Sequence, residues 1–397
     1  MNAKQSALPV LVAGGGIGGI AAALALVRRG FSVKVLEQAP QLGEIGAGIQ
    51  LGPNVTRRLQ ALGVSEGLMR IAARPDALVV RSATGGGEIA RLPLGNAMLR
   101  SYAAPYLCVH RADLHAVLLA AVRGSGAVTL TTSARVTHVT VRGDLVCASS
   151  ADARAWEGDA LVGADGLWST VRPSVVEDPA PPRATGHTAW RAMVDQASLP
   201  APLRSSRITV WLGPRLHAVV YPVRRGDLLN VVVLAESAPV GDARDWDQST
   251  SLSALQNATG RVCGELQALL EAVPRWRAWT LNDRPPLTRP DQMAAERVAL
   301  TGDAAHPMLP YLAQGAGMAI EDAVTLAESL DGCDTEKVPA AFARYADARW
   351  ERNANVQLRA RRNGEIFHAT GLVRAGRDAA LRLLGARLLD MPWLYDA

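Results

Sequence analysis

Residues 14–19 restrict the fold of this chain more than any other feature. They read Gly-Gly-Gly-Ile-Gly-Gly and fit the pattern Gly-x-Gly-x-x-Gly, with an apolar run at 10–13 before them and an Ala/Leu-rich stretch at 20–29 after them. Glycines between a strand and a helix let the backbone turn tightly and approach a pyrophosphate, which the helix N-terminus stabilises. The pattern predicts a dinucleotide site in an α/β fold, with contacts from Gly14, Gly16 and Gly19.

An acidic residue follows where such a site needs one. The stretch 31–37 predicts a second strand and ends at Glu37, 18 residues after Gly19. A carboxylate there can accept hydrogen bonds from the hydroxyls of an adenosine ribose. The alternative is a glycine-rich turn without a ligand, and the combination of strand, helix and acid argues against it. The motif does not distinguish FAD from NAD.

Two later motifs contain further acids. The first, at 163–172, is Gly-Ala-Asp-Gly-Leu-Trp-Ser-Thr-Val-Arg, in which Asp165 by itself would mark a common turn. The second, at 302–307, is Gly-Asp-Ala-Ala-His-Pro, where Asp303 can hold the ribityl hydroxyls of a flavin or merely cap a helix. His306 belongs to this motif, so a structural role beside the cofactor is expected. A helix predicted over 315–330 can place its N-terminal N–H groups at an electron-rich ring edge, through Gly315, Ala316 and Gly317.

The three motifs, in this order and spacing, resemble those of the class A flavoprotein monooxygenases, the group that contains 4-hydroxybenzoate and salicylate hydroxylases. The resemblance runs from about residue 9 to 395. It implies FAD as the cofactor, NADH or NADPH as a transient co-substrate, and contacts from Asp165 to both. It also implies that Arg111 contacts the FAD phosphate and ribose region and that segment 46–54 is a glycine-containing loop near the flavin. The alternatives are a surface residue at a helix start for Arg111 and a flexible connection for 46–54.

A strand-like stretch at 216–222 carries His217 and Tyr221. Positions four apart share one face of a strand, so both side chains can point at one ligand and relay a phenolic proton. From spacing alone, ordinary packing on a half-buried strand is favoured. The resemblance shifts this balance, because the salicylate, 3-hydroxybenzoate and 6-hydroxynicotinate hydroxylase branch has a His-x-x-x-Tyr strand facing the substrate. It also brings Gln314 close to the substrate, with a loop side chain bonded to nearby backbone as the alternative.

The composition changes near residue 181. Strand-like runs at 189–194, 208–212, 216–222 and 228–234 are separated by Gly and Pro and predict an antiparallel sheet inserted into the α/β domain. The fold class expected is therefore α/β, with a Rossmann-like FAD-binding domain (1–75, 101–180 and 286–340), a substrate domain (76–100 and 181–285) and a C-terminal helical segment (341–397). The active site is expected between the inserted sheet and the flavin ring, because such pockets favour domain interfaces.

Charge and composition narrow the partners. The net charge is +5, but basic residues are spread along the chain and mixed with acids, so no nucleic-acid partner is expected. No apolar run is long enough to cross a bilayer and no signal peptide is recognised, so a cytoplasmic location is expected. The four cysteines are scattered, and histidines such as His187 and His368 form no cluster with acids or cysteines at metal-ligand spacing. Neither a disulfide framework nor a metal is therefore expected.

The resemblance implies an FAD-dependent monooxygenase that hydroxylates a small aromatic acid, such as salicylate or a hydroxybenzoate, with NAD(P)H and O2. The alternative is a flavin-dependent dehydrogenase or electron-transfer enzyme that does not activate oxygen, and the complete motifs at 163–172 and 302–307 argue against it. An FAD-binding regulator is a third reading, opposed only weakly by the His-Tyr pair. The sequence leaves open the aromatic acid, the ring position, whether a carboxyl group is lost, NADH against NADPH, and monomer against homodimer.

Overall fold

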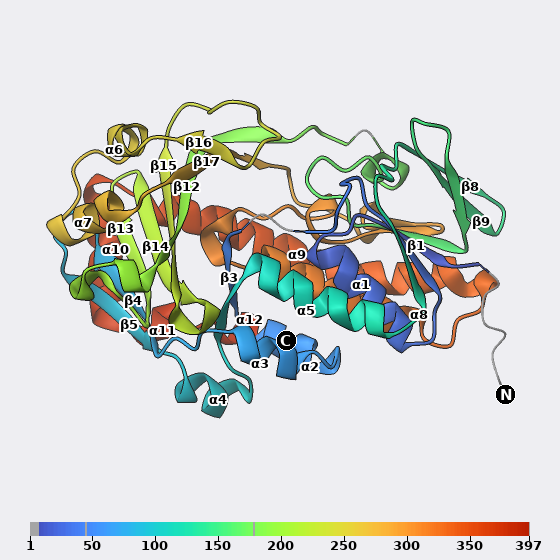
Figure 1. Ribbon diagram of the computed structural model, residues 1–397, viewed down its shortest axis with the longest axis horizontal. Helices are drawn as coiled ribbons and strands as arrows, with labels where there is room; N and C mark the ends of the chain where they lie inside the picture. The colour runs from blue at the N-terminus through green and yellow to red at the C-terminus, as the bar shows by residue number, and fades with distance from the viewer. Residues whose placement is uncertain (1–7, 44–45, 178, 397) are drawn as a thin grey trace.

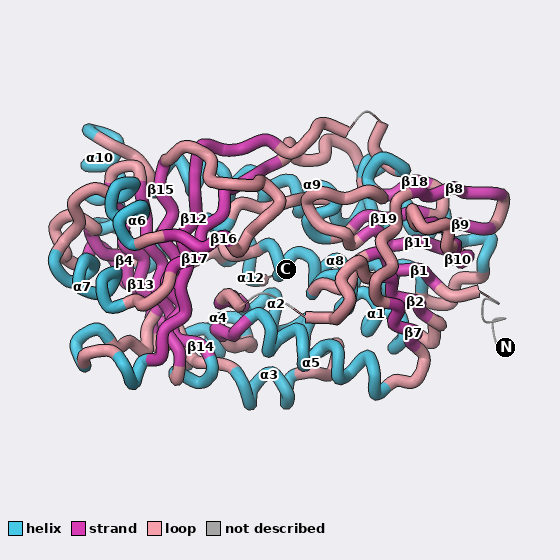
Figure 2. Tube along the Cα trace, turned by 45° about the horizontal axis from the view of Figure 1, so that its top comes forward, coloured by secondary structure: helices cyan, strands magenta, loops and turns pink. Residues whose placement is uncertain are grey.

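Two sheets at opposite ends of an elongated molecule organise the chain (Figure 1). The computed structural model describes residues 8–43, 46–177 and 179–396. The expectation that no signal peptide is present rests largely on residues 1–7, which lie outside the described residues. Long helices run between the two sheets, and Figure 2 shows the strands gathered at the two ends.

The first sheet forms around the N-terminal strand β1. Its order is β18-β19-β11-β1-β2-β7, and all neighbouring strands are parallel except β18 and β19. The central strands β1 and β11 are buried at every position, as expected for a parallel sheet covered on both faces. The strands are β1 (Val10–Ala13), β2 (Val33–Leu36), β7 (Val128–Thr131), β11 (Ala160–Gly163), β18 (Ala294–Ala295) and β19 (Val298–Leu300).

Helix α1 (Ile17–Arg28) packs on this sheet and contacts two further helices. These are α5 (Arg111–Gly124) and α8 (Gly315–Leu330). Most of α1 is buried, which explains its Ala- and Leu-rich composition. The helix predicted over 315–330 is confirmed, and so is the Rossmann-like core. A small meander of β8 (His138–Arg142), β9 (Leu145–Ser149) and β10 (Ala155–Gly158) adjoins the sheet.

The second sheet has the order β16-β17-β12-β15-β14-β13-β4-β5. Its inserted, largely antiparallel character agrees with the prediction, with one difference. Strand β4 pairs with β13 in parallel, because β4 comes from a distant part of the chain and is not joined to β13 by a hairpin. The strands are β4 (Ala77–Ser82), β5 (Glu88–Pro93), β12 (Arg183–Asp195), β13 (Ile208–Gly213), β14 (Leu216–Val223), β15 (Leu228–Glu236), β16 (Gln248–Thr250) and β17 (Trp276–Asp283).

Helices α6 (Leu252–Thr259) and α7 (Gly264–Ala272) share a core with one face of this sheet. The other face looks toward the C-terminal helices, which begin with α9 (Val338–Phe367), a 30-residue helix that extends toward both ends of the molecule (Figure 1). It is followed by α10 (Gly371–Leu384), α11 (Ala386–Leu389) and α12 (Pro392–Tyr395). Among the described residues, no helix combines the length and the apolar character that a membrane crossing requires.

The segment 46–54 differs from the loop that the resemblance implied. Gly48–Leu51 forms strand β3, which pairs antiparallel with β6 (Leu107–His110), and Pro53 begins helix α2 (Pro53–Ala61). Helices α3 (Ser65–Ile71) and α4 (Asn96–Tyr102) complete this region. The expectation of a loop was wrong for most of the segment, since pairing with a strand almost 60 residues later supplies hydrogen bonds that local sequence does not reveal.

Candidate active site

The glycine motif lies where β1 turns into α1, and two of its glycines have no room for a side chain. Gly14 has a φ of +108°, and a Cβ added there would lie 2.3 Å from the carbonyl oxygen of Ala164. A Cβ on Gly19 would lie 1.9 Å from the carbonyl oxygen of Gly14. His115, on α5, donates from Nε2 to the Gly15 carbonyl at 2.7 Å and holds the turn from outside. This tight turn at a helix N-terminus fits a pyrophosphate.

Glu37 closes the same site from the end of β2. Its Oε2 accepts a hydrogen bond from the Gly15 backbone N–H at 2.6 Å, and its Oε1 accepts one from Ala39 at 2.7 Å. The carboxylate therefore lies directly against the glycine turn, as a ribose acceptor must. Its contact with a ribose stays a prediction.

Asp165 shapes the turn of the second motif. Its Oδ2 accepts hydrogen bonds from the backbone N–H groups of Thr170 (2.7 Å) and Val171 (3.1 Å). Its Oδ1 is buried without a hydrogen-bond partner among the described residues. Since a buried carboxylate oxygen is costly to leave unsatisfied, this atom fits a ligand that supplies a donor, although the cofactor role of Asp165 stays a prediction.

Arg172 joins the second motif to the third. Its Nη1 donates to the carbonyl oxygens of Ala304 (2.7 Å) and Ala305 (2.8 Å). Burial, together with nearby Arg284, lowers the pKa of Arg172 to about 10. In the sequence, Arg172 is only the last residue of the motif at 163–172. In the structure, its guanidinium group joins that motif to the motif at 302–307 through these hydrogen bonds.

Asp303 lies in a short 3-10 turn, Gly302–Ala304, that faces the start of α8. Its side chain is exposed, and its Oδ1 is 4.0 Å from the position that a Cβ on Gly315 would take. An acid and a helix N-terminus are thus presented together, as predicted for a ribityl chain and a flavin ring edge. The assigned contacts of Asp303, Gly315, Ala316 and Gly317 stay predictions.

Gln314 precedes α8 and is buried. Its Oε1 accepts a hydrogen bond from Asn54 Nδ2 at 3.0 Å, and the same nitrogen donates to Glu321 at 2.8 Å. The carboxamide oxygen of Gln314 therefore belongs to a buried network that links α2 with α8. A contact between Gln314 and substrate stays a prediction.

The sequence did not reveal the ionic network beneath α8. Arg349, on α9, donates to Glu321 and Asp322 at 2.8 Å each, and all three side chains are buried. Nε2 of His306 lies 2.5 Å from Asp322, which matches the structural role expected for His306. Burial pushes the pKa of Asp322 upward, but His306 and Arg349 outweigh it and hold that pKa well below its usual value.

Arg111 begins α5, and its backbone N–H donates to the Ala47 carbonyl at 2.7 Å. Its guanidinium carbon lies 5.8 Å from the ring centroid of Trp246. The residue therefore ties segment 46–54 to the helix beside the glycine motif. Its contact with FAD stays a prediction.

His217 and Tyr221 share one face of β14, as their spacing predicted. Leu216, Ala218 and Val220 belong to the core under α6 and α7, whereas Tyr221 packs in a separate cluster with residues of β6 and α9. Only 1% of His217 and 5% of Tyr221 is exposed. A Cβ on Gly48 would lie 2.5 Å from the Tyr221 ring, so glycine at that position lets β3 approach the tyrosine.

The buried pair is electrically neutral near neutral pH. Burial, then the neighbouring His368 and His187, hold the pKa of His217 well below its usual value. Burial also raises the pKa of Tyr221 far above its usual value. The neutral imidazole of His217 has a nitrogen lone pair that can accept a proton, while its lowered pKa makes it a weaker base than a free imidazole.

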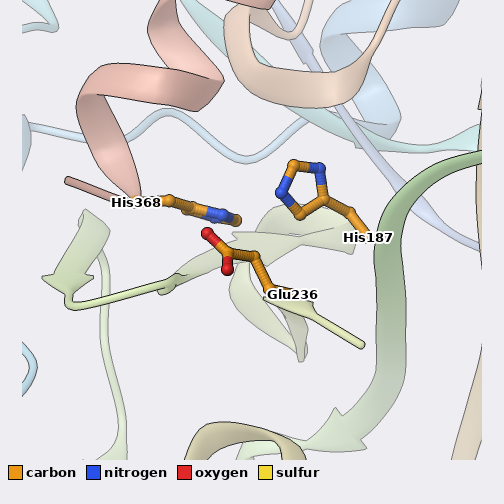
Figure 3. Close-up of side chains that lie close together, drawn as sticks. All are labelled: His187, Glu236 and His368. Atoms are coloured by element: carbon orange, nitrogen blue, oxygen red, sulfur yellow. The ribbon is translucent and has the colours of Figure 1, made fainter. Parts of the chain in front are cut away.

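The expectation that the histidines form no cluster with acids was wrong. His187 on β12, Glu236 at the end of β15 and His368 after α9 point toward one another (Figure 3), with one side-chain N or O atom of each within 4.8 Å of the others. The residues are 49 and 132 positions apart, so linear spacing could not show the group. The absence of a metal from this group stays a prediction.

Comparisons with known proteins agree with this geometry. A family model described as an FAD binding domain matches residues 7–358. The 3-hydroxybenzoate 6-hydroxylase of Polaromonas naphthalenivorans (strain CJ2) is 42% identical over 398 residues, which cover 100% of this chain and 97% of the relative. The 6-hydroxynicotinate 3-monooxygenase of Bordetella bronchiseptica (strain ATCC BAA-588 / NCTC 13252 / RB50) is 36% identical, over 88% of this chain and 89% of its own length.

Two solved structures, each 26% identical to this chain, are similar throughout. HpxO of Klebsiella pneumoniae, complexed with FAD and uric acid, has a TM-score of 0.82 and covers 96% of this chain and 94% of its own. A salicylate hydroxylase substrate complex also has a TM-score of 0.82, with coverage of 98% and 95%.

Proposed function

Because this chain belongs to the FAD binding domain family and is an FAD-dependent monooxygenase that hydroxylates a small aromatic acid with NAD(P)H and O2, we propose 3-hydroxybenzoate as its substrate and carbon 6 as the position hydroxylated. The observation that carries this proposal is His217, a buried neutral base on the same strand face as Tyr221. Three relatives named as 3-hydroxybenzoate 6-hydroxylases, 38–42% identical over at least 93% of this chain, support the choice of acid.

A base suits this chemistry because a phenolate directs electron density to the ortho and para carbons of its ring. Carbon 6 of 3-hydroxybenzoate is para to the hydroxyl group. We assign the removal of the phenolic proton to Nε2 of His217, since Nδ1 lies 2.8 Å from His368. Tyr221 is assigned to orient the phenolic oxygen from the same face of β14.

The residues present fit FAD at three places: the side-chain-free turn at Gly14 and Gly19, the unsatisfied Oδ1 of Asp165, and the acid and helix start at Asp303 and Gly315. When bound, FAD supplies electron transfer from NAD(P)H and the activation of oxygen. The chain itself binds and orients the cofactor, stabilises negative charge at the N-terminus of α8, and excludes water from His217.

We propose the division 1–75, 101–180 and 286–340 for FAD binding, 76–100 and 181–285 for the substrate, and 341–397 as a helical closure. The separation of the two sheets supports it, since the six-stranded sheet draws on the first set and the eight-stranded sheet on the second. A cytoplasmic location, the absence of a nucleic-acid partner, and a monomeric or homodimeric state stay predictions.

A panel of aromatic acids tests the proposed substrate. The purified protein is mixed with NADH or NADPH and with 3-hydroxybenzoate, salicylate or 6-hydroxynicotinate, while oxygen uptake and products are measured. We expect 3-hydroxybenzoate to give the fastest coupled turnover, with 2,5-dihydroxybenzoate as product. Coupled turnover with another acid only would replace the substrate, and NAD(P)H oxidation without oxygen uptake would favour the dehydrogenase.

A further inference from the structure

The proposed base is isolated from solvent, and a proton that it accepts has to leave through protein groups. Nδ1 of His217 lies 2.8 Å from Nε2 of His368, and both rings are buried. Tyr311 and Phe367 also pack against the His217 ring, with centroids 5.3 Å away in each case. Among these three neighbours of the ring, His368 is the one whose hydrogen bond can carry a proton onward.

His368 reaches toward the surface on its other side. It belongs to the group with His187 and Glu236, whose atoms lie within 4.8 Å of one another (Figure 3). Glu236 is exposed at the end of β15, whereas Nδ1 of His368 is buried without a hydrogen-bond partner among the described residues. This nitrogen is therefore open to a hydrogen bond with a group or water that reaches it. A carboxylate oxygen of Glu236 and a ring nitrogen of His368 lie within 4.8 Å of each other, a separation that one bridging water spans.

We propose that His368 relays the phenolic proton from His217 to Glu236, which releases it to solvent. This inference rests on the proposed function, because it needs a phenol that His217 deprotonates. His368 is a positioning residue in this scheme, since it acts through His217 and does not touch the substrate.

Protons balance along the chain of groups. At the start, His217 carries its proton on Nδ1 and His368 carries its proton on Nδ1. The phenol O–H bond breaks and Nε2 of His217 takes the proton, while the Nδ1 proton of His217 passes to Nε2 of His368 and the Nδ1 proton of His368 passes to Glu236. Both imidazoles end in their other neutral tautomer. When the product regains its phenolic proton from His217, the same transfers run in reverse, with one proton entering at Glu236.

The surroundings of His368 favour this neutral route over a stored imidazolium. Burial, then His187 and Arg377, lower the pKa of His368 to about 3. Other polar neighbours are Tyr311, whose hydroxyl lies 3.0 Å from Nδ1 of His187, and Arg215, which lies 3.6 Å from Glu236. A protonated ring is therefore disfavoured at either histidine, and concerted exchange of tautomers avoids that state.

The test follows a phenolic proton directly with 3-hydroxy-4-nitrobenzoate, whose phenolate is coloured. The FAD-loaded protein is used in excess over the probe and with EDTA present. Rapid mixing raises the pH, and the colour of the bound probe is followed. The rate of probe dissociation is measured separately. We expect His368→Gln, which keeps a polar side chain beside His217 but cannot pass a proton, to slow the bound-probe change by about 10²-fold.

Further variants separate relay from packing. His368→Ala is expected to deprotonate the bound probe slowly, and added imidazole is expected to restore the rate. Glu236→Gln is also expected to slow the deprotonation. Asp227→Asn, which changes an exposed acid at the other end of β15, is not. A His368→Gln protein that binds the probe and deprotonates it at the wild-type rate overturns the relay. If His368→Gln fully restores the rate that His368→Ala loses, His368 acts only by positioning and the relay is overturned. A wild-type protein that binds no phenolic probe contradicts the proposed function instead.

Discussion

Nδ1 of His217 lies 2.8 Å from Nε2 of His368, although 151 residues separate the two in the chain. The bond joins a strand of the inserted sheet to the residue that follows the long helix α9. Because Nδ1 is engaged with His368, the orientation of the His217 ring is fixed and Nε2 is the nitrogen that remains for the proposed contact with substrate. The catalytic role proposed for His217 therefore depends on how α9 docks against β14, and not on the strand alone.

His217→Ala should slow hydroxylation by roughly 10²–10⁴-fold while leaving FAD binding nearly unchanged, because it removes a general base. NAD(P)H oxidation should continue and release hydrogen peroxide in place of hydroxylated product. Tyr221→Phe should show the same uncoupling if it shares the substrate contact. The measurement is product formed per NAD(P)H consumed at saturating aromatic acid, and a wild-type ratio and rate in His217→Ala would reduce the pair to strand packing.

Glu37→Lys should weaken FAD binding, since it places a cation where the ribose hydroxyls need an acceptor and removes the bond to Gly15 N. Fluorescence titration of the apoprotein with FAD measures the loss. Glu66→Lys is the matched control, because Glu66 is an exposed acid on α3. Equal FAD affinity in both variants would mean that the site at the glycine turn is misassigned.

Asp303→Ala should weaken FAD binding or slow flavin reduction with little effect on the fold. The lost acceptor bond is worth about 0.5–1.5 kcal/mol as a neutral hydrogen bond and more when charged. FAD affinity and the rate of reduction by NAD(P)H are compared with those of Asp291→Ala, a change at another exposed aspartate in a short 3-10 turn. Wild-type values for both quantities in Asp303→Ala would contradict its ribityl role.

Arg349→Met should destabilise the protein by about 3–5 kcal/mol, because it leaves Glu321 and Asp322 buried without their main cation. Arg344→Met, on the exposed side of the same helix, should change little. Urea unfolding of both variants with saturating FAD measures the difference. Similar midpoints for the two would show that Arg352 and His306 compensate for the missing charge.

Acidification should destabilise the protein before its carboxylates titrate. Burial lowers the pKa values of His217, His368 and His187, so unfolding takes up protons as the pH falls below the unfolded value of about 6.5. The contribution of these neutral histidines to the free energy of unfolding is present above that pH. It is lost on acidification, at up to about 1.4 kcal/mol per pH unit for each histidine.

Unfolding free energies at pH 7.5, 6.5, 5.5 and 4.5 measure this slope. His368→Gln should flatten it by one histidine, whereas His138→Gln, at an exposed position, should not. Parallel curves for wild type and His368→Gln would contradict the buried, neutral state assigned to His368.

Much of the fold could be predicted from the sequence because its signals are local. The turn at Gly14 and Gly19 needs only neighbouring residues and a φ that glycine allows, and the helix at 315–330 follows from continuous composition. The shared face of His217 and Tyr221 follows from the period of two in any strand. Three motifs, each a continuous stretch of sequence, carried the resemblance that predicted FAD as the cofactor and hydroxylation as the reaction.

The tertiary structure alone decided what surrounds those residues. The pairing of His217 with His368, the approach of His187 and Glu236, and the ionic bonds of Arg349 join segments whose distance along the chain carries no periodic signal. Segment 46–54 likewise became strand β3 and the start of α2 because β6 offered a partner. Local sequence specifies backbone geometry, whereas contacts between distant segments depend on how whole elements pack. The contacts on which the proposed proton route rests are of the second kind.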